Sequence, residues 1–267
     1  MTTPRLPITR RTQRRIVRPA PRFKAPRFKA LPFKALPFTA LASTALAFSV
    51  IVAPPASAAP QVEASWQMNE APGATVMLDS SGHGFNGAIN QAGLDTGQVY
   101  NGATGYRWAY KDPNGLPVAN ERIINVADND RLDPMNDVYT LEIRYRTTRN
   151  FGNIVQKGQS TTPGGQVKIQ NPQGRPSCLF KSGSGQVGVR VPTALNDNQW
   201  HTLTCVKEPT RLTMYVDGVY VGRKNGSTGI INNKSPISIG GKTNCDQVTI
   251  TCDYYTGDID YIKITRG

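Results

Sequence analysis

The stretch HTLTCVKEPTRLTMYVDG, residues 201–218, decides the fold class. Leu203 and Cys205 alternate with threonines, which is the period of a strand that has one buried face and one face in water. A second apolar run follows, and Asp217-Gly218 then separates it from a third. Two strand-like runs joined by Asp-Gly indicate a β-hairpin. This stretch therefore predicts antiparallel β-structure.

The same alternation recurs on both sides of this hairpin, and no window shows a sustained helical period. The chain carries 25 glycines and 20 prolines, which punctuate it into short segments. We expect an all-β domain built as a two-sheet antiparallel sandwich. Besides the hairpin, the predicted strands are 123–126, 141–145, 154–157, 167–170, 187–191, 237–239, 248–251 and 259–264.

Residues 1–58 have the composition of a secretory signal peptide. They hold 11 Lys or Arg and no acid, with five-residue repeats in a basic n-region, and then an apolar run over 38–53. That run is shorter than the ~20 residues of a permanent membrane span, and Ala56-Ser57-Ala58 suits a signal peptidase. We expect cleavage after Ala58, a short tail over 59–64 and one domain over 65–267. The alternative, an uncleaved anchor, is disfavoured because prolines and small residues follow at once.

The basic charge of the chain lies mostly in this leader. The formal net charge is +13, but residues 59–267 hold 20 basic and 18 acidic residues, which leaves +2. A nucleic-acid interface needs clustered positive charge on the folded domain. We therefore expect no nucleic-acid partner.

The four cysteines follow the leader, at Cys178, Cys205, Cys245 and Cys252. An even number in an exported chain predicts two disulfides, for which three pairings are possible. We expect Cys178 to pair with Cys205 and Cys245 with Cys252, because each pair lies in neighbouring strand-like segments. The alternative is a zinc site, but the sequence contains no C-x-x-C pair to support it.

Eight sequence fragments, taken together and in order, resemble the laminin-G-like domains of the concanavalin A-like lectin/glucanase superfamily. The resemblance implies a jelly roll in which the first and last strands lie close together. Members bind sugars, bind proteins, serve as spacers or hydrolyse glycans, so the fold does not decide the function. The fragments are WQMNE (66–70), DSSGHGFNG (79–87), YTLEIRY (139–145), QKG (156–158), NQWHTLT (198–204), LTMYVDG (212–218), ISIG (237–240) and GDIDYIKI (257–264).

The glucanases of this superfamily carry a signature similar to E-x-D-x-x-E on one strand. The nearest string here is Asp258-Ile259-Asp260, which lacks the third acid. Glycoside hydrolysis needs a pair of placed carboxylates. We therefore expect no enzyme, with glycoside hydrolase as the least favoured alternative. We also expect Asp258 and Asp260 to share one strand face, and Ile259 and Tyr261 the other.

Aromatic residues are the candidates for sugar binding, since flat rings pack against sugar C–H groups. Trp108, Tyr254 and Tyr255 are the candidate ligand-binding residues; the competing interpretation is that they belong to the core. Tyr106 and Tyr110 share the strand face of Trp108.

The resemblance also allows a structural calcium ion, because some members hold one at the edge of the sandwich. Glu70, Asp79 and Asp260 are its candidate ligands, although surface carboxylates and turn caps are the simpler interpretation. No cofactor is required. The turn at Asp79-Ser80-Ser81-Gly82 is expected to be architectural, with side chains accepting from local amides.

Two further residues have expected structural roles. Trp200 is expected to cap one end of the core, and His201 to be a packed, hydrogen-bonded ring. The sequence as a whole predicts a secreted, noncatalytic recognition module without a permanent membrane span. Its expected partner is an extracellular glycan; the alternative is an extracellular protein, in an adhesive or structural role.

Overall fold

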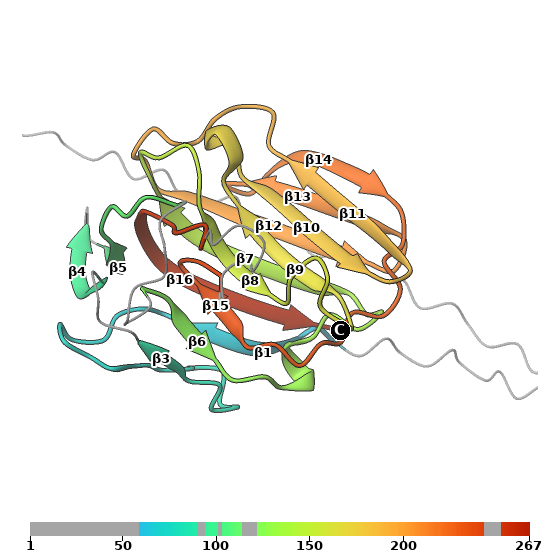
Figure 1. The fold of residues 1–267 in the computed structure, drawn as a ribbon, viewed down its shortest axis with the longest axis horizontal. Helices are drawn as coiled ribbons and strands as arrows, with labels where there is room; N and C mark the ends of the chain where they lie inside the picture. The colour runs from blue at the N-terminus through green and yellow to red at the C-terminus, as the bar shows by residue number, and fades with distance from the viewer. Residues whose placement is uncertain (1–58, 90–93, 101–102, 114–121, 243–251) are drawn as a thin grey trace, which may run out of the picture. The chain divides into compact units, whose positions relative to one another are not determined.

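The computed structural model describes residues 59–89, 94–100, 103–113, 122–242 and 252–267, with the backbone alone for 94–100 and 103. The predicted leader and its cleavage site lie outside these residues. Two antiparallel sheets are stacked face to face (Figure 1), which confirms the predicted jelly-roll sandwich. Short 3-10 turns at η1 (Asp130–Leu132) and η2 (Pro172–Gly174) are the helical elements of the described residues.

Sheet A contains the first and the last strands of the domain. Its order is β14-β13-β12-β7-β16-β5-β4, and β1 pairs with the C-terminal half of β16. The predicted closeness of the first and last strands is thereby confirmed. The strands are β1 (Gln61–Trp66), β4 (Leu94–Tyr100), β5 (Ala103–Trp108), β7 (Tyr139–Arg146), β12 (His201–Glu208), β13 (Arg211–Val216), β14 (Val219–Asn225) and β16 (Gly257–Arg266).

Sheet B covers the other side of the core, in the order β11-β10-β9-β8-β15-β6-β3-β2. The strands are β2 (Val76–Met77), β3 (Gly87–Ile89), β6 (Ile124–Val126), β8 (Asn153–Lys157), β9 (Gln166–Gln170), β10 (Ser177–Ser182), β11 (Gly185–Arg190) and β15 (Ile237–Ile239). Each strand expected from alternation is present with ends shifted by a few residues, except 248–251, which lies outside the described residues.

One expected strand face is wrong. A β-bulge shifts the register of β16 against β7 between Ile259 and Tyr261. Ile259 faces the core, whereas the Tyr261 hydroxyl donates to Glu142 on the outer face of sheet A. The extra residue of a bulge reverses the side-chain alternation beyond it, and a period-two pattern does not foresee that.

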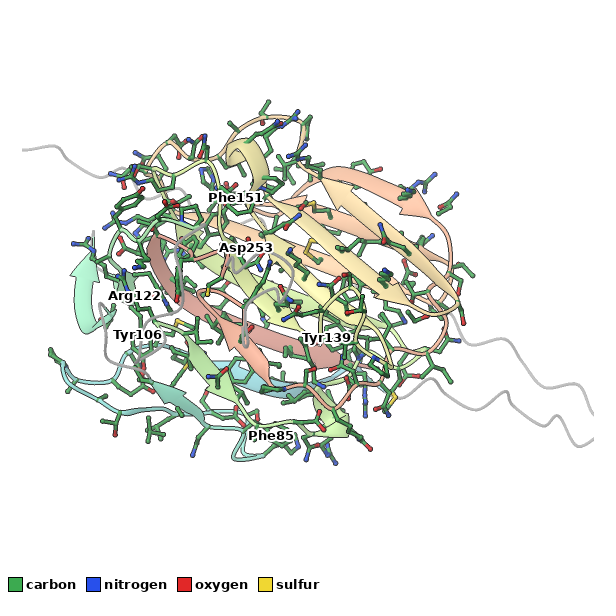
Figure 2. All side chains as sticks on the ribbon, viewed as in Figure 1. Phe85, Tyr106, Arg122, Tyr139, Phe151 and Asp253 are labelled. Carbon is green, nitrogen blue, oxygen red and sulfur yellow. A yellow bond between two sulfur atoms is a disulfide. The ribbon has the colours of Figure 1, made fainter. Side chains whose placement is uncertain are left out.

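The core is continuous between the sheets and contains several aromatic rings. Tyr139 and Tyr106, both labelled in Figure 2, are nearly inaccessible to solvent. Tyr139 of sheet A meets Phe180 of sheet B edge to face, with 6.0 Å between ring centroids. Large rings that bridge two layers contribute both buried area and a defined geometry.

The bond between Cys178 and Cys205 joins the two sheets, since Cys178 lies on β10 and Cys205 on β12. This pairing was predicted and is confirmed. The bridge closes a loop with a sequence separation of 27 residues, which corresponds to roughly 3.5 kcal/mol in a chain-entropy estimate. Cys252 is buried and disulfide-bonded. Cys245 lies outside the described residues, so the second pairing stays a prediction.

Candidate functional site at the end of sheet A

A cavity of about 230 Å³ opens at the end of sheet A where β7 finishes and β16 begins. We call it the end pocket. Its lining comes from the end of β5, the segment that follows β7, one loop residue before β12, and the start of β16. The lining residues are Arg107, Trp108, Ala109, Tyr110, Arg146, Thr147, Thr148, Asn198, Thr256, Gly257 and Asp258.

Asp258 forms the charged centre of the end pocket. Its Oδ1 accepts from Arg107 Nε at 2.9 Å, and its Oδ2 accepts from Arg146 Nε at 2.7 Å. The Asp258 side chain is 6% exposed and that of Arg146 is 10% exposed, whereas that of Arg107 is 40% exposed. The carboxylate is therefore held between an inner and an outer guanidinium.

The strand register produces this arrangement. Asp258 lies opposite Arg146 on β7 and opposite Arg107 on β5, so all three project from the same face of three adjacent strands. Gly257 allows the close approach, since a Cβ there would lie 2.3 Å from the Arg146 carbonyl oxygen. A glycine at the start of β16 is therefore required by its contact with β7.

The segment before β12 forms a second wall. Asn198 has a positive φ of 67°, and its N–H donates to the Thr147 carbonyl at 3.1 Å. Trp200 lies against the Arg144 and Arg146 guanidinium groups, with ring-centroid distances of 4.9 and 5.0 Å. The expectation that Trp200 caps the core is therefore wrong. Its indole packs on the charged outer face of sheet A. Cation–π contacts with the two guanidinium groups stabilise this position.

Tyr110 supplies an aromatic surface at the rim of the pocket. Its side chain is 58% exposed. The Arg149 guanidinium lies over the ring, with 4.2 Å from Cζ to the ring centroid. The ring is thus held by a cation–π contact while much of its area stays accessible to solvent.

The three aromatic residues predicted to bind a ligand are buried. Trp108 lines the pocket but is 1% exposed, and its Nε1 donates to the Arg122 carbonyl at 3.1 Å. Tyr254 and Tyr255 are each 2% exposed. The Tyr255 hydroxyl lies 2.8 Å from the Arg146 carbonyl oxygen, and burial raises its pKa well above the ordinary value. These positions fit the competing interpretation, in which the rings form the core beneath the pocket.

The candidate calcium ligands occupy separate hydrogen-bonding sites. Glu70 accepts from the Leu78 N–H at 2.7 Å and from the Tyr106 hydroxyl. Asp260 is paired with Arg144 on the outer face of sheet A. In the described part of the chain, no three His, Cys, Asp or Glu side chains form a group suited to a metal ion. Calcium binding stays an untested prediction.

Asp79 organises the turn that follows β2, as the sequence predicts. Its Oδ1 accepts from the amides of Ser65 and Ser81, each at 2.9 Å. Its Oδ2 accepts from the Ser81 hydroxyl at 2.7 Å and the Phe85 amide at 3.0 Å. Burial raises the pKa of Asp79, but these hydrogen bonds outweigh burial and leave the pKa below its ordinary value.

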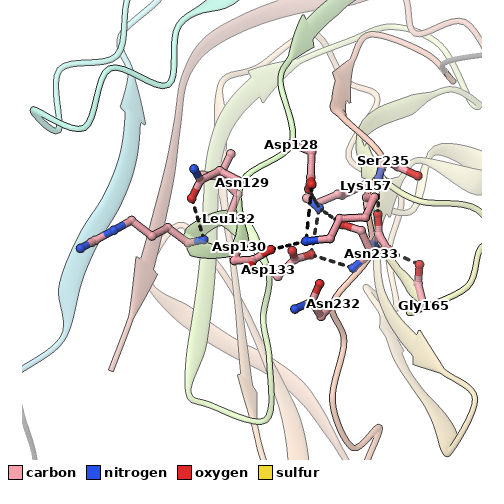
Figure 3. A network of polar contacts seen from close by, with 12 residues as sticks. Asp128, Asn129, Asp130, Leu132, Asp133, Lys157, Gly165, Asn232, Asn233 and Ser235 are labelled. Carbon is pink, nitrogen blue, oxygen red and sulfur yellow. Dashed lines mark hydrogen bonds and ion pairs between the residues drawn. The ribbon is translucent and has the colours of Figure 1, made fainter.

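A second ionic cluster surrounds Lys157, which we call the Lys157 cluster (Figure 3). The Lys157 Nζ lies 2.7 Å from Asp128 Oδ1 and 2.9 Å from Asp133 Oδ1. It also donates to the Asn233 carbonyl at 2.6 Å. The Asp133 side chain is inaccessible to solvent, and burial raises its pKa although Lys157 opposes that effect. One buried ammonium group thus joins η1, β8 and the segment before β15.

His201 has the expected packed and hydrogen-bonded position. Its Nδ1 lies 2.8 Å from Asp217 Oδ2, and its Nε2 lies 3.2 Å from Asp197 Oδ1. The ring is 13% exposed. It connects the hairpin turn to the segment that forms the second wall of the end pocket.

Sequence reasoning missed the polar residues of the end pocket. Arg107, Arg146 and Asn198 come from three segments that are far apart in the chain, so no local motif joins them. The available signal was the pair of alternating strings R-Y-R (144–146) and D-I-D (258–260). Opposite charges at matching positions of neighbouring strands are expected to pair across the sheet.

No helix among the described residues is both long and apolar enough to cross a membrane. A protein with a related sequence is the basement membrane-specific heparan sulfate proteoglycan core protein of Mus musculus. It is 26% identical over 125 residues, which cover 45% of this chain and 3% of that protein. The chain thus spans a very small part of that relative's length.

Solved structures of similar fold include domain 4 of AbnA, an extracellular arabinanase from Geobacillus stearothermophilus, in complex with arabinotriose. Its TM-score is 0.54 with 13% identity, covering 78% of this chain and 93% of that domain. The binding domain of botulinum neurotoxin serotype G has a TM-score of 0.53 with 14% identity, covering 77% of this chain and 47% of that chain. At these identities the likeness concerns the fold. A family model matches residues 119–266, and the chain therefore belongs to the concanavalin A-like lectin/glucanases superfamily.

Proposed function

We propose that the protein is a secreted, noncatalytic recognition module that binds carbohydrate in the end pocket. The observation that carries the proposal is the exposed Tyr110 ring beside a cavity lined with hydrogen-bonding groups. A flat ring packs against the C–H face of a sugar, while amide, hydroxyl and guanidinium groups bind its hydroxyls. Asn198 and Thr148 are exposed at the same cavity.

The size of the cavity favours a small ligand. At about 230 Å³ it lies below the range of roughly 300–1,000 Å³ typical of drug-sized ligands. One sugar residue with its substituents suits such a volume better than several residues of a chain. The proposed ligand is therefore recognised through a single residue of the glycan.

The charge arrangement supports binding without hydrolysis. A glycosidase needs two carboxyl groups, one of them as an acid or nucleophile free to react. Asp258 is the one carboxylate among the described lining residues, and both its oxygens accept from guanidinium groups. Both oxygens of this carboxylate are thus occupied by protein contacts, and the described lining offers no second carboxyl group to work with it.

Secretion is supported by the composition of residues 1–58 and by the disulfide between the sheets. The structural neighbour solved with arabinotriose supports a sugar as the ligand class. The exposed Tyr110 ring beside the end pocket favours a sugar over the alternative, an extracellular protein partner.

The test is a glycan array probed with the full chain produced in a secreting host, followed by calorimetry with the best ligand. Tyr110→Ala is expected to weaken binding at least tenfold, because the packing of the Tyr110 ring against the sugar contributes a large part of the contact area. Tyr220→Ala is the matched control, since Tyr220 is 54% exposed but lies on β14, away from the pocket.

An array without signal would overturn the proposal. Equal losses in the two tyrosine variants would also count against it, since the ligand would then not depend on the end pocket. Release of reducing sugar from a bound glycan would overturn the noncatalytic assignment.

A further inference from the structure

We infer that His201 is a positioning residue for the end pocket, and that the protonated ring holds the second wall around Asn198 in place. This inference rests on the proposed function and deepens it, because it concerns the regulation of the same site by pH. Two observations carry it: the partners of the two ring nitrogens, and the turn that joins the ring to Asn198.

Both ring nitrogens of His201 meet a carboxylate. Nδ1 lies 2.8 Å from Asp217 Oδ2, and Nε2 lies 3.2 and 3.4 Å from the two carboxylate oxygens of Asp197. An ionised carboxylate accepts hydrogen bonds but donates none, so each contact needs a proton on the ring nitrogen. Only the imidazolium form carries both protons. A neutral ring therefore keeps one contact and loses the other.

Asp197 connects the ring to the second wall. Its Oδ1 accepts from the Gln199 amide at 2.9 Å, so the carboxylate bridges the backbone across Asn198. The Gln199 amide and His201 together lower the pKa of Asp197, although burial opposes them, and the carboxylate is ionised near neutral pH. Asn198 lies in the left-handed region, with a φ of 67°. The bridge across Asn198 stabilises that conformation.

Asp217 anchors the other side of the ring to the hairpin turn between β13 and β14. Its Oδ1 accepts from the Thr202 amide at 2.7 Å, and its own N–H donates to the Thr202 carbonyl at 2.8 Å. The hairpin turn is thus held to β12 by two contacts that do not involve the ring. The contact to Asp197 is longer than the contact to Asp217, so it is the one expected to weaken when the ring loses a proton.

His201 has the titration range that such a pH response requires. The titratable groups that face its ring are Asp197, Asp217 and Tyr145, which lies opposite it on β7. Carboxylates titrate below about pH 5, and an unperturbed imidazole titrates near pH 6.5. Burial raises the pKa of Tyr145 above its ordinary value, and the two carboxylates act in the same direction. Among these groups, a change between pH 5 and pH 9 therefore belongs to His201, and the wall is held more firmly at the acidic end.

The experiment is a pH titration of the full chain by NMR, which needs no sugar. The nitrogen-15 shifts of the His201 ring report its protonation, and the Asn198 and Gln199 amide signals report the second wall. We expect the amide signals to change with the same midpoint as the ring. The protection of the Asn198 amide from solvent exchange is expected to be about threefold lower at pH 8.5 than at pH 5.5, the size of a modest hydrogen bond. The effect is modest because the side chains of Asp197 and Asp217 are 52% and 49% exposed.

Three variants assign the effect to the ring and its partner. His201→Gln keeps a hydrogen-bonding side chain that does not titrate, and it is expected to abolish the response of the Asn198 amide. Asp197→Asn keeps the shape of the bridging side chain without its charge, and it is expected to leave the ring titrating while the wall no longer responds. His83→Gln is the matched control, because His83 is the other histidine of the chain and does not line the end pocket.

The outcomes separate this inference from the proposed function. Wall signals that stay constant while the ring titrates would overturn the inference, as would a response that survives in His201→Gln or disappears in His83→Gln. A ring that does not titrate between pH 5 and pH 9 would overturn it as well. An empty glycan array would overturn the proposed function, whereas a second wall that follows the protonation of His201 would remain established.

Discussion

The Lys157 cluster and the end pocket are built from the same chemistry and differ in their access to water. Each places cationic side chains against aspartates at places where separate segments meet. The Lys157 side chain is 2% exposed and Asp133 is 0% exposed. In the end pocket, by contrast, Arg107 is 40% exposed and Tyr110 is 58% exposed.

This difference indicates which cluster serves the fold and which can serve a ligand. In the Lys157 cluster, the ammonium group has three partners within the protein: Asp128, Asp133 and the Asn233 carbonyl. The pairing offsets much of the cost of burying these charges, although the buried Asp133 Oδ2 accepts no hydrogen bond. The end pocket pairs its inner charges in the same way, but it leaves a guanidinium and an aromatic ring at its rim. Substitutions in the two clusters should therefore change different properties.

The largest effect is expected for Lys157→Met. Removing the ammonium group leaves the buried Asp133 without its cation, at a cost of about 3–5 kcal/mol in the free energy of unfolding. Urea denaturation of the full chain measures it. Lys234→Met is the matched control, because the Lys234 side chain is 72% exposed and pairs with the exposed Asp130. That variant is expected to change the free energy of unfolding far less, because water screens an exposed ion pair. Similar stabilities of the two variants would contradict the distinction.

The second effect is expected for Asp258→Asn, which removes the charge at the centre of the end pocket but keeps the shape of the side chain. Arg146 then loses its buried partner, whereas water can reach Arg107. We expect a loss of about 2 kcal/mol, smaller than for Lys157→Met because one of the two guanidinium groups can be solvated. Denaturation of both variants in the same buffer makes the comparison. A larger loss than for Lys157→Met would mean that solvent exposure does not determine how much each cluster contributes to stability.

Asp79 extends the comparison to a carboxylate held by amide and hydroxyl groups without a cation. Because its folded-state pKa is lowered, its contribution to stability is present above the unfolded-state pKa of about 3.9 and is lost as the pH falls through the folded-state value. Asp79→Asn is expected to cost about 1–2 kcal/mol at pH 6. The difference from the unsubstituted protein should shrink as the pH falls below about 4.

Denaturation curves at several pH values test this dependence. Asp137→Asn serves as the control, since the Asp137 side chain is 54% exposed at the protein surface. A difference for Asp79→Asn that stays constant down to pH 2 would show that the effect is one of shape rather than of charge.

The fold was largely predictable because one-sided burial leaves its period in the sequence. β7 shows the alternation from Tyr139 to Tyr145, and the Asp217-Gly218 turn marks the hairpin directly. The inter-sheet disulfide followed from cysteines in strand-like segments. The bulge after Ile259 was not predictable in this way, because an inserted residue breaks the period without changing the composition.

The candidate site was much less predictable, because the sequence does not show which aromatic residues are buried and which are exposed. Trp108, Tyr254 and Tyr255 have the side chains of a sugar-binding site, but aromatic residues are also favoured in cores, and the sequence does not separate these roles. Tyr110 shares a short segment with Trp108 and differs from it in exposure. The charged partners around Asp258 depend on the register of three strands, which is set by tertiary structure.

The smallest effect on stability is expected for Arg149→Gln. The Arg149 side chain is exposed, and its ring contact with Tyr110 is a surface cation–π pair worth about 0.5–1 kcal/mol. The free energy of unfolding should therefore change by no more than about that amount. Thermal denaturation of Arg149→Gln and of the unsubstituted protein measures this change. If Arg149→Gln destabilised the protein as much as Asp258→Asn, Arg149 would belong to the structural charges of the end pocket, and the rim would have no cation left for a ligand.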